Sequence, residues 1–153
     1  MIVRGMFISL ALCTALLVGC GPAGQVKTYS VKGKVTFGGK PMVGGGSIAL
    51  IPLSNQEGKT AGGEIKEDGT YELMTYTPGD GSMAGDFRVV ITQTTVKEPT
   101  PTADGAPAPN STIFTVPQAD RIPPIYGDIQ NSPLTTKVEA KPLNELNFDL
   151  TRQ

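Results

Sequence analysis

The chain has 153 residues, with 13 basic and 14 acidic side chains, two cysteines and no histidine. It contains no run of Lys and Arg with interleaved aromatic residues, which disfavours nucleic acid as a partner. Because histidine is absent, the usual histidine ligands of zinc and iron and the base of a serine hydrolase triad are missing. The composition therefore predicts no metal site, no cofactor and no catalytic residues.

The N-terminal segment, residues 1–19, has the layout of a secretory signal peptide. A short region containing Arg4 precedes an apolar run over residues 6–18. A membrane-spanning helix is the alternative, but this run falls short of the roughly 20 residues that cross a bilayer. We therefore expect the protein to be exported.

The residues around the end of this segment, Leu17-Val18-Gly19-Cys20, resemble the lipobox of bacterial lipoproteins. The resemblance implies that Cys20 becomes the lipidated first residue of the mature protein. Acyl chains such as palmitate would then hold the protein stably, since each buried methylene contributes about 0.8 kcal/mol. The expected partner is thus the membrane, through lipid on Cys20, either the cell membrane or the outer membrane.

Residues 20–29 are polar, contain glycine and lack hydrophobic periodicity, a pattern typical of a tether. As a flexible coil, this lipidated tether would span roughly 15–18 Å and hold the domain close to the membrane. The other cysteine, Cys13, leaves with the signal, so the folded part would have neither a disulfide nor a thiolate metal site.

Residues 30–150 are predicted to form one all-β domain. Alternating apolar residues bounded by Gly, Pro and Asp-Gly turns predict strands, and no segment has a convincing helical period. The predicted strands are residues 30–37, 47–51, 60–65, 71–73, 87–91, 134–139 and 145–150. Seven strands are typical of an antiparallel β-sandwich.

The alternation also predicts which side chains fill the core. These are Val31, Val35, Phe37, Ile48, Leu50, Tyr71, Leu73, Phe87, Val89, Ile91, Val138, Leu146, Phe148 and Leu150.

The strand pattern is interrupted at residues 97–133, a proline-rich excursion that holds eight of the 13 prolines. Such density excludes regular central strands. Residues 98–110 are low-complexity and lack large apolar side chains, so we expect a dispensable loop or mobile arm. Ile122, Ile125 and Tyr126 are expected to lay an extended segment back against the body.

Three short motifs resemble the carboxypeptidase-regulatory-like, transthyretin-like (prealbumin-like) domains: residues 33–44, 67–73 and 85–91. The family normally has Pro where this chain has Ala84. The resemblance implies a transthyretin-like β-sandwich and, for lipid-anchored bacterial members, an accessory or binding module without catalytic residues. Enzymes of this fold class rely on His, which this chain lacks.

Three aromatic side chains outside the predicted core are candidates for contacts with a ligand: Tyr76, Phe114 and Tyr126. For Tyr126, pinning the proline-rich return segment is the favoured alternative. Glu64, Glu67 and Asp68 could pair as acid and base, but carboxylates on a hairpin are more often solvated turn residues.

Two hypotheses of function follow. The first is a membrane-anchored envelope lipoprotein whose noncatalytic module is structural or binds an envelope protein or a glycan. The alternative is a small-ligand carrier or a carboxylate-dependent enzyme that uses a pocket in the sandwich. A concave pocket with converging polar groups would favour the second.

Overall fold

The computed structural model describes residues 25–54, 56–98 and 113–152, and the predicted signal peptide and Cys20 lie outside them. The prediction of an all-β protein is confirmed, because two short 3-10 turns are the helical elements in this part of the chain. The strands are β1 (Thr28–Phe37), β2 (Lys40–Pro41), β3 (Gly46–Pro52), β4 (Ala61–Ile65), β5 (Thr70–Glu72), β6 (Ser82–Met83), β7 (Gly85–Gln93), β8 (Val96–Lys97), β9 (Phe114–Thr115), β10 (Thr135–Val138), β11 (Leu143–Glu145) and β12 (Phe148–Leu150). The 3-10 turns are η1 (Gln118–Asp120) and η2 (Pro124–Gly127).

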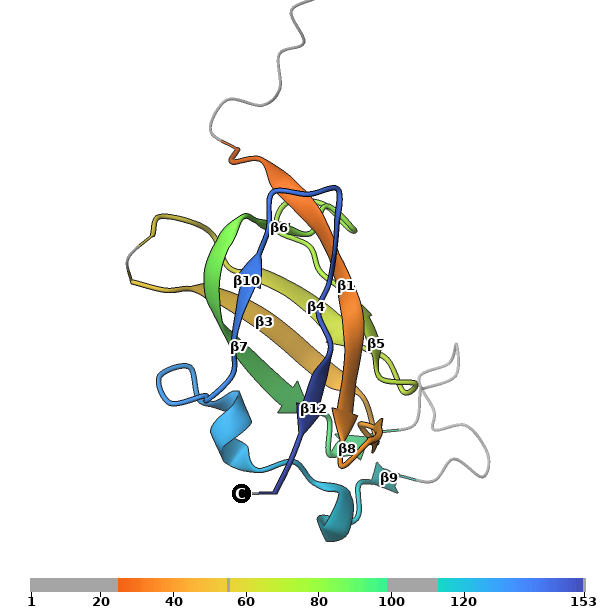
Figure 1. The fold of residues 1–153 in the computed structure, drawn as a ribbon. Helices are drawn as coiled ribbons and strands as arrows, with labels where there is room; N and C mark the ends of the chain where they lie inside the picture. The colour runs from red at the N-terminus through yellow and green to blue at the C-terminus, as the bar shows by residue number, and fades with distance from the viewer. Residues whose placement is uncertain (1–24, 55, 99–112, 153) are drawn as a thin grey trace, which may run out of the picture.

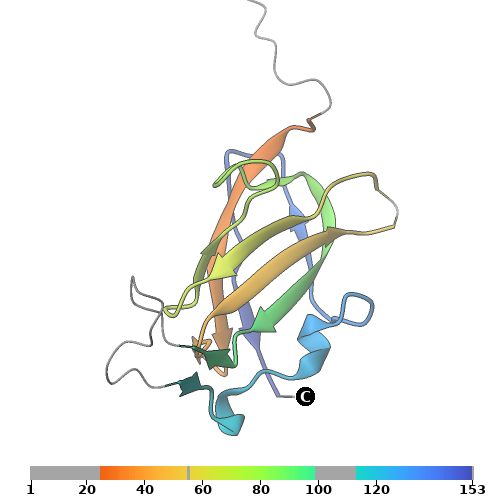
Figure 2. The same cartoon turned by 180° about the vertical axis from the view of Figure 1, so that it is seen from behind.

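The strands form one curled sheet with the order β10-β7-β3-β4-β5-β1-β11. β12, β2 and β6 also pair with β1, and β8 pairs separately with β9. The curl brings β10, at one end of this path, to the same side of the molecule as β12, which pairs with β1, so that both lie in front of β3 and β4 in Figure 1. Figure 2 shows β3, β4 and β7 from behind. The result is a half-barrel that wraps around a single core.

The predicted antiparallel arrangement is wrong at the last strands, because β11 and β12 both pair with β1 in parallel. The other pairings in this sheet are antiparallel, as in β3 with β7. Parallel neighbours need a long connection between them, and here nearly the whole domain separates β1 from β11.

The predicted strand 145–150 is in fact interrupted at Leu146 and Asn147. The Asn147 side-chain oxygen accepts a hydrogen bond from the Lys34 amide at 2.9 Å, where a continuous ladder would offer a backbone carbonyl. The Leu146 carbonyl instead accepts the Tyr71 hydroxyl at 2.5 Å. A Cβ on Gly33 would lie 1.8 Å from that carbonyl oxygen, so glycine is what allows the crossing chain to approach β1.

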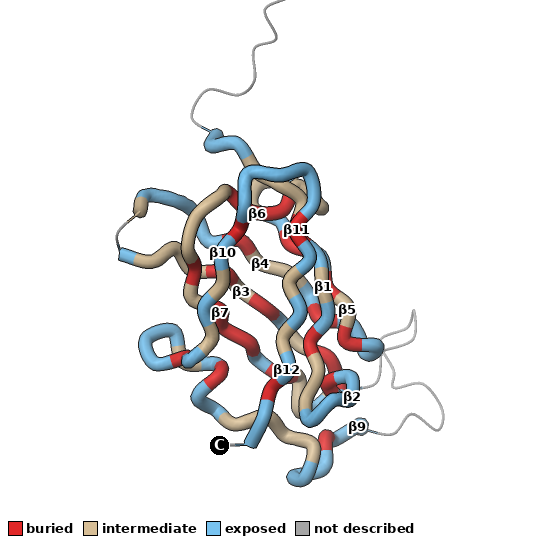
Figure 3. The backbone as a smooth tube through the Cα atoms, viewed as in Figure 1, coloured by how far each residue is buried: buried red, intermediate tan, exposed pale blue. Residues whose placement is uncertain are grey.

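Apolar side chains of the strands meet in one core, and the buried residues are the red segments of the tube in Figure 3. Most of the predicted core residues are buried, while Phe37, Leu146 and Phe148 are partly buried and pack against the others. The prediction missed Met42, Ala61, Ile65, Met83 and Tyr126. Most of these lie in short or irregular segments, where alternation gives no signal.

Only short elements occur in the described parts of the proline-rich excursion, namely β8, β9, η1 and η2. η2 packs against β7. The prediction for residues 98–110 concerns a segment that, apart from Glu98, lies outside the described residues. At the other end of the domain, β1 begins at Thr28, so Thr28 and Tyr29 of the predicted tether pair with β6.

Candidate functional site

The candidate site is a cleft at the end of the half-barrel opposite the start of β1. η1, η2 and the last described residues gather at this end (Figure 1). Two hollows lie here, with cavity volumes of about 260 and 500 Å³. Both are lined by residues 121–124, so this segment is a ridge between two parts of one site, called here the distal cleft.

The two parts of the distal cleft differ in chemistry. The larger hollow has three polar side chains, those of Gln118, Arg121 and Arg152. The smaller hollow is lined by Ile91 and by the ridge, with the hydroxyl groups of Thr92 and Thr95. Arg121 borders both hollows. The larger one also has Arg152 and is the more basic, whereas the smaller one is mainly apolar with polar groups from Thr92, Gln93 and Thr95.

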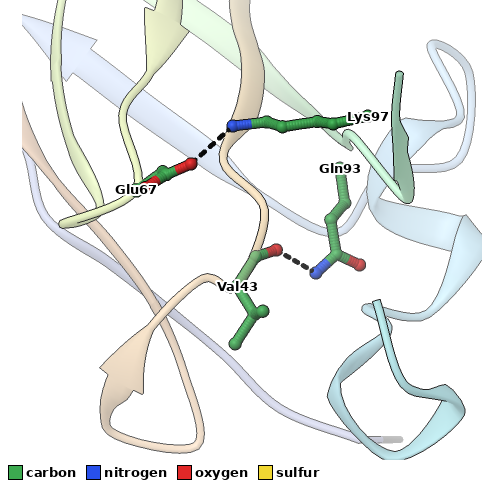
Figure 4. A network of polar contacts seen from close by, with 4 residues as sticks. All are labelled: Val43, Glu67, Gln93 and Lys97. Atoms are coloured by element: carbon green, nitrogen blue, oxygen red, sulfur yellow. Dashed lines mark hydrogen bonds and ion pairs between the residues drawn. The ribbon is translucent and has the colours of Figure 1, made fainter. Parts of the chain in front are cut away.

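Gln93, at the end of β7, fixes the ridge to the body. Its side-chain Nε2 donates to the carbonyl of Val43 at 2.8 Å, as Figure 4 shows, and to that of Asp120 at 3.0 Å. Its Oε1 accepts the amide of Ile122 at 3.0 Å. The side chain is 9% exposed, and these three hydrogen bonds satisfy its amide group. Gln93 thus sets where residues 120–122 lie on β7.

Each arginine of the cleft has a contact that positions its guanidinium group. Arg121 Nε donates to the Val116 carbonyl at 3.1 Å, within the return segment. The Arg152 guanidinium lies over the Phe37 ring, 5.6 Å from its centroid, which is a cation–π geometry. The ion pairs in the described part of the chain join Lys97 to Glu67 and Lys141 to Glu139, and neither uses these arginines.

The prolines explain why the cleft has a stiff wall. Pro117 precedes η1, and Pro123 precedes η2, whose first residue is Pro124. Each proline ring fixes φ near −65°, so the backbone of the ridge loses little further freedom on binding. The wall is therefore formed before any ligand arrives.

Two of the predicted ligand-contacting aromatics lie at opposite ends of the domain. The Tyr76 hydroxyl accepts the Val26 amide at 3.1 Å, near the start of β1, and Lys59 Nζ lies 5.0 Å from its ring centroid. Phe114 is 41% exposed on β9 and lies close to Gly44, beyond the other end of β1. The structure does not bring these two side chains together.

Tyr126, the third candidate, lies inside the body and is 3% exposed. Its hydroxyl donates to the Thr151 carbonyl at 3.0 Å and accepts the Thr151 amide at 3.1 Å. This pair of bonds joins η2 to the chain that follows β12. The contacts are those of a side chain that pins the return segment.

Hydrogen bonds favour the ionised form of two carboxylates of the hairpin, Glu67 and Asp68. The hydrogen bond from Lys97, together with its charge, lowers the pKa of Glu67. Hydrogen bonds from the hydroxyl and amide of Thr70 lower the pKa of Asp68. A general acid needs a raised pKa, so these two groups are unsuited to donating a proton near neutral pH.

Within residues 25–54, 56–98 and 113–152, no three His, Cys, Asp or Glu side chains are grouped so that they could hold a metal ion. The same residues include no helix long and apolar enough to cross a membrane.

Sequence reasoning missed the polar residues of the distal cleft, Gln93, Arg121 and Arg152. None of these three residues belongs to a recognisable sequence motif. The available signal was indirect: a return segment expected to pack on the body must have its backbone groups satisfied, and a polar residue at the end of a buried strand can do this.

Comparisons with known proteins do not assign this chain to a family. No family model matches it, and no curated protein matches it. A 9R-lipoxygenase from Cyanothece PCC8801 is similar over 82% of this chain and 16% of its own, with 12% identity and a TM-score of 0.37. A likeness this distant carries no conclusion about the function of this chain.

Proposed function

We propose that this protein is an exported lipoprotein of the bacterial envelope. Lipid on Cys20 anchors it to the cell membrane or the outer membrane, and its β domain is a noncatalytic module that binds an envelope partner. The observation that carries the proposal is the order Leu17-Val18-Gly19-Cys20 after an apolar run too short to cross a bilayer.

The geometry of the domain supports a role in binding as well as in structure. The chain from Cys20 to Thr28 can reach at most about 30 Å, even when fully extended. An anchor at Cys20 would therefore keep the start of β1 near the membrane, and the distal cleft lies at the opposite end (Figure 1). A site held away from the lipid is accessible to a partner in the envelope.

We also propose that the half-barrel is a variant of the transthyretin-like sandwich. The path of the curled sheet has seven positions, from β10 to β11. The curl encloses one apolar core. An enclosed core supports the proposal, since a sandwich also buries apolar side chains between β layers.

The anchoring proposal is tested by the variant Cys20→Ser, with Cys13→Ser as a matched control. We expect mass spectrometry of the wild type to find a mature chain that begins at an acylated Cys20 and sediments with membranes. Cys20→Ser should remain a full-length precursor or become soluble, whereas Cys13→Ser should be processed like the wild type. An unmodified Cys20 in the wild-type protein would contradict the proposal.

A further inference from the structure

We propose that the distal cleft binds an acidic peptide segment of a partner protein. A carboxylate of the segment binds between Arg121 and Arg152, and a neighbouring apolar side chain enters the smaller hollow. This inference rests on the proposed function as a binding module and names the chemistry of its partner.

The charge of the larger hollow selects an anion. Arg121 and Arg152 supply two guanidinium groups, while the lining residues that the structure describes include no Asp or Glu. The planar guanidinium presents paired N–H donors that match a carboxylate, and hydrogen bonds between charged groups are about twice as strong as neutral ones. The amide of Gln118 adds a further donor at the same hollow.

The smaller hollow selects an apolar side chain next to that anion. Ile91 and Ile122 line it, together with the rings of Pro123 and Pro124. Its volume of about 260 Å³ is ample for one aliphatic side chain. Because both hollows border the same ridge, a carboxylate and an apolar group on adjacent residues of one extended chain can occupy them together.

A peptide fits this lining better than an acidic saccharide does. Sugar rings commonly pack their apolar faces against flat aromatic side chains, and neither hollow is lined by an aromatic residue. The ring of Phe37, which contacts Arg152, has the guanidinium group over it. The aliphatic and proline lining suits a branched side chain instead.

The site is also organised in advance. Gln93 holds the backbone on both sides of Arg121, and the Val116 carbonyl holds the Arg121 side chain. A ridge fixed in this way spends less conformational entropy on binding than a loop would. Gln93 is therefore a positioning residue for the cleft.

The test uses the purified full chain in detergent micelles and fluorescein-labelled peptides of alternating Leu and Asp. The probes for comparison are the same peptide with Asn for Asp, and an oligogalacturonate with the same number of carboxylates. We expect the acidic peptide to bind at least about tenfold more tightly than the neutral one. Its binding should weaken steeply in 1 M salt, where charges are screened beyond about 3 Å.

Charge-removing variants locate the binding. Arg152→Gln and Arg121→Gln should each weaken binding about tenfold or more. Lys141→Gln, which removes one positive charge on the far connection between β10 and β11, should not change it. Arg121→Lys keeps the charge but loses the planar pair of N–H donors, so its affinity for the acidic peptide should lie between those of the wild type and Arg121→Gln. Thermal melting of each variant shows that the fold is retained.

The proposal is overturned if neither peptide binds, if the neutral peptide binds equally well, or if the arginine variants bind like Lys141→Gln. Tighter binding of the oligogalacturonate than of the acidic peptide would also overturn it, in favour of a glycan. None of these outcomes alters the lipidation of Cys20. Failure of the anchor and failure of the cleft are therefore separate results.

Discussion

The half-barrel and the return segment over residues 113–131 are held in place by different means. In the half-barrel, backbone ladders and buried apolar side chains act together: β3 and β7 pair continuously from Gly46 with Gln93 to Pro52 with Phe87. In the return segment, beyond the short pairing of β9 with β8, single side chains of the body bond to the backbone, as Gln93 does at Asp120 and Ile122. Arg88 of β7 donates to the carbonyls of Ile129 and Gln130 in the same way.

This difference indicates which interactions stabilise each region. In a ladder the stabilising free energy is distributed over many hydrogen bonds, and in the core it is distributed over many apolar contacts. A side chain that bonds to backbone is a discrete anchor worth about 0.5–1.5 kcal/mol per hydrogen bond. Changes in the body should therefore reduce global stability, whereas changes at an anchor should release the distal cleft first.

The largest expected effect is that of Phe87→Ala, which destabilises the half-barrel. Phe87 is fully buried on β7. Replacing it leaves a cavity, and the free energy of unfolding should fall by about 3–5 kcal/mol in denaturant titrations. Leu143→Ala, at a position 38% exposed on β11, is the control and should cost far less. Equal losses would show that the core is not centred on β7.

The body could be predicted from sequence because one face of each strand is buried. Val31 and Val35 on β1, and Phe87, Val89 and Ile91 on β7, alternate with more exposed residues and lie in the core. The pairing of strands could not be predicted in this way. Alternation is the same in parallel and antiparallel strands, so nothing in residues 143–150 indicates that they pair with β1 in parallel.

The second expected effect is that of Gln93→Leu, which removes three hydrogen bonds and keeps the approximate volume. The partly buried amide of Ile122 and the carbonyl of Val43 would lose their partners. We expect a loss of about 2–3 kcal/mol by chemical denaturation, and weaker binding of the acidic peptide, since the ridge would no longer be fixed. Gln25→Leu, the same change at an exposed glutamine before β1 and outside the distal cleft, is the control. A loss of stability with unchanged binding would show that Gln93 does not position the cleft.

A smaller effect is expected for Tyr126→Phe, which keeps the buried ring and removes its hydroxyl. Both bonds to Thr151 are lost, so stability should fall by about 1–2 kcal/mol. Tyr76→Phe removes one exposed bond to Val26 and should cost little in the same melting experiment. The reverse ranking would mean that the return segment is not pinned at Tyr126.

The site itself could be predicted only in part. The sequence indicated that Tyr126 belongs to a segment that returns to the body, because apolar residues reappear after a proline-rich stretch. It could not show that Arg121 and Arg152, separated by 30 positions, border one hollow. Their proximity depends on how η1 and the end of β12 meet, which no local pattern encodes.

The smallest expected effect concerns pH and Asp149, which lies within the ladder between β1 and β12, opposite Thr36. Hydrogen bonds from the Thr36 hydroxyl and the Gly39 amide lower its pKa in the folded state. Stability from a lowered carboxyl pKa is present above the unfolded value of about 3.9 and is lost as pH falls through the folded value. Unfolding titrations below pH 4 should therefore show a shallower pH dependence for Asp149→Asn than for the wild type. An unchanged slope would mean that these bonds do not favour the carboxylate.

Native-state hydrogen exchange on the wild-type protein tests the contrast between the two regions most directly. The amides of the body, such as those of Val89 and Leu73, should exchange only through global unfolding, because ladders and core contacts hold them. The amides of Val116, Ile122 and Tyr126 should exchange through a smaller opening with a lower free energy, since isolated hydrogen bonds to Thr95, Gln93 and Pro123 hold them in place of a long ladder. If the amides of both regions instead exchange with the same free energy and the same dependence on denaturant, the return segment is part of one cooperative unit and the contrast is contradicted.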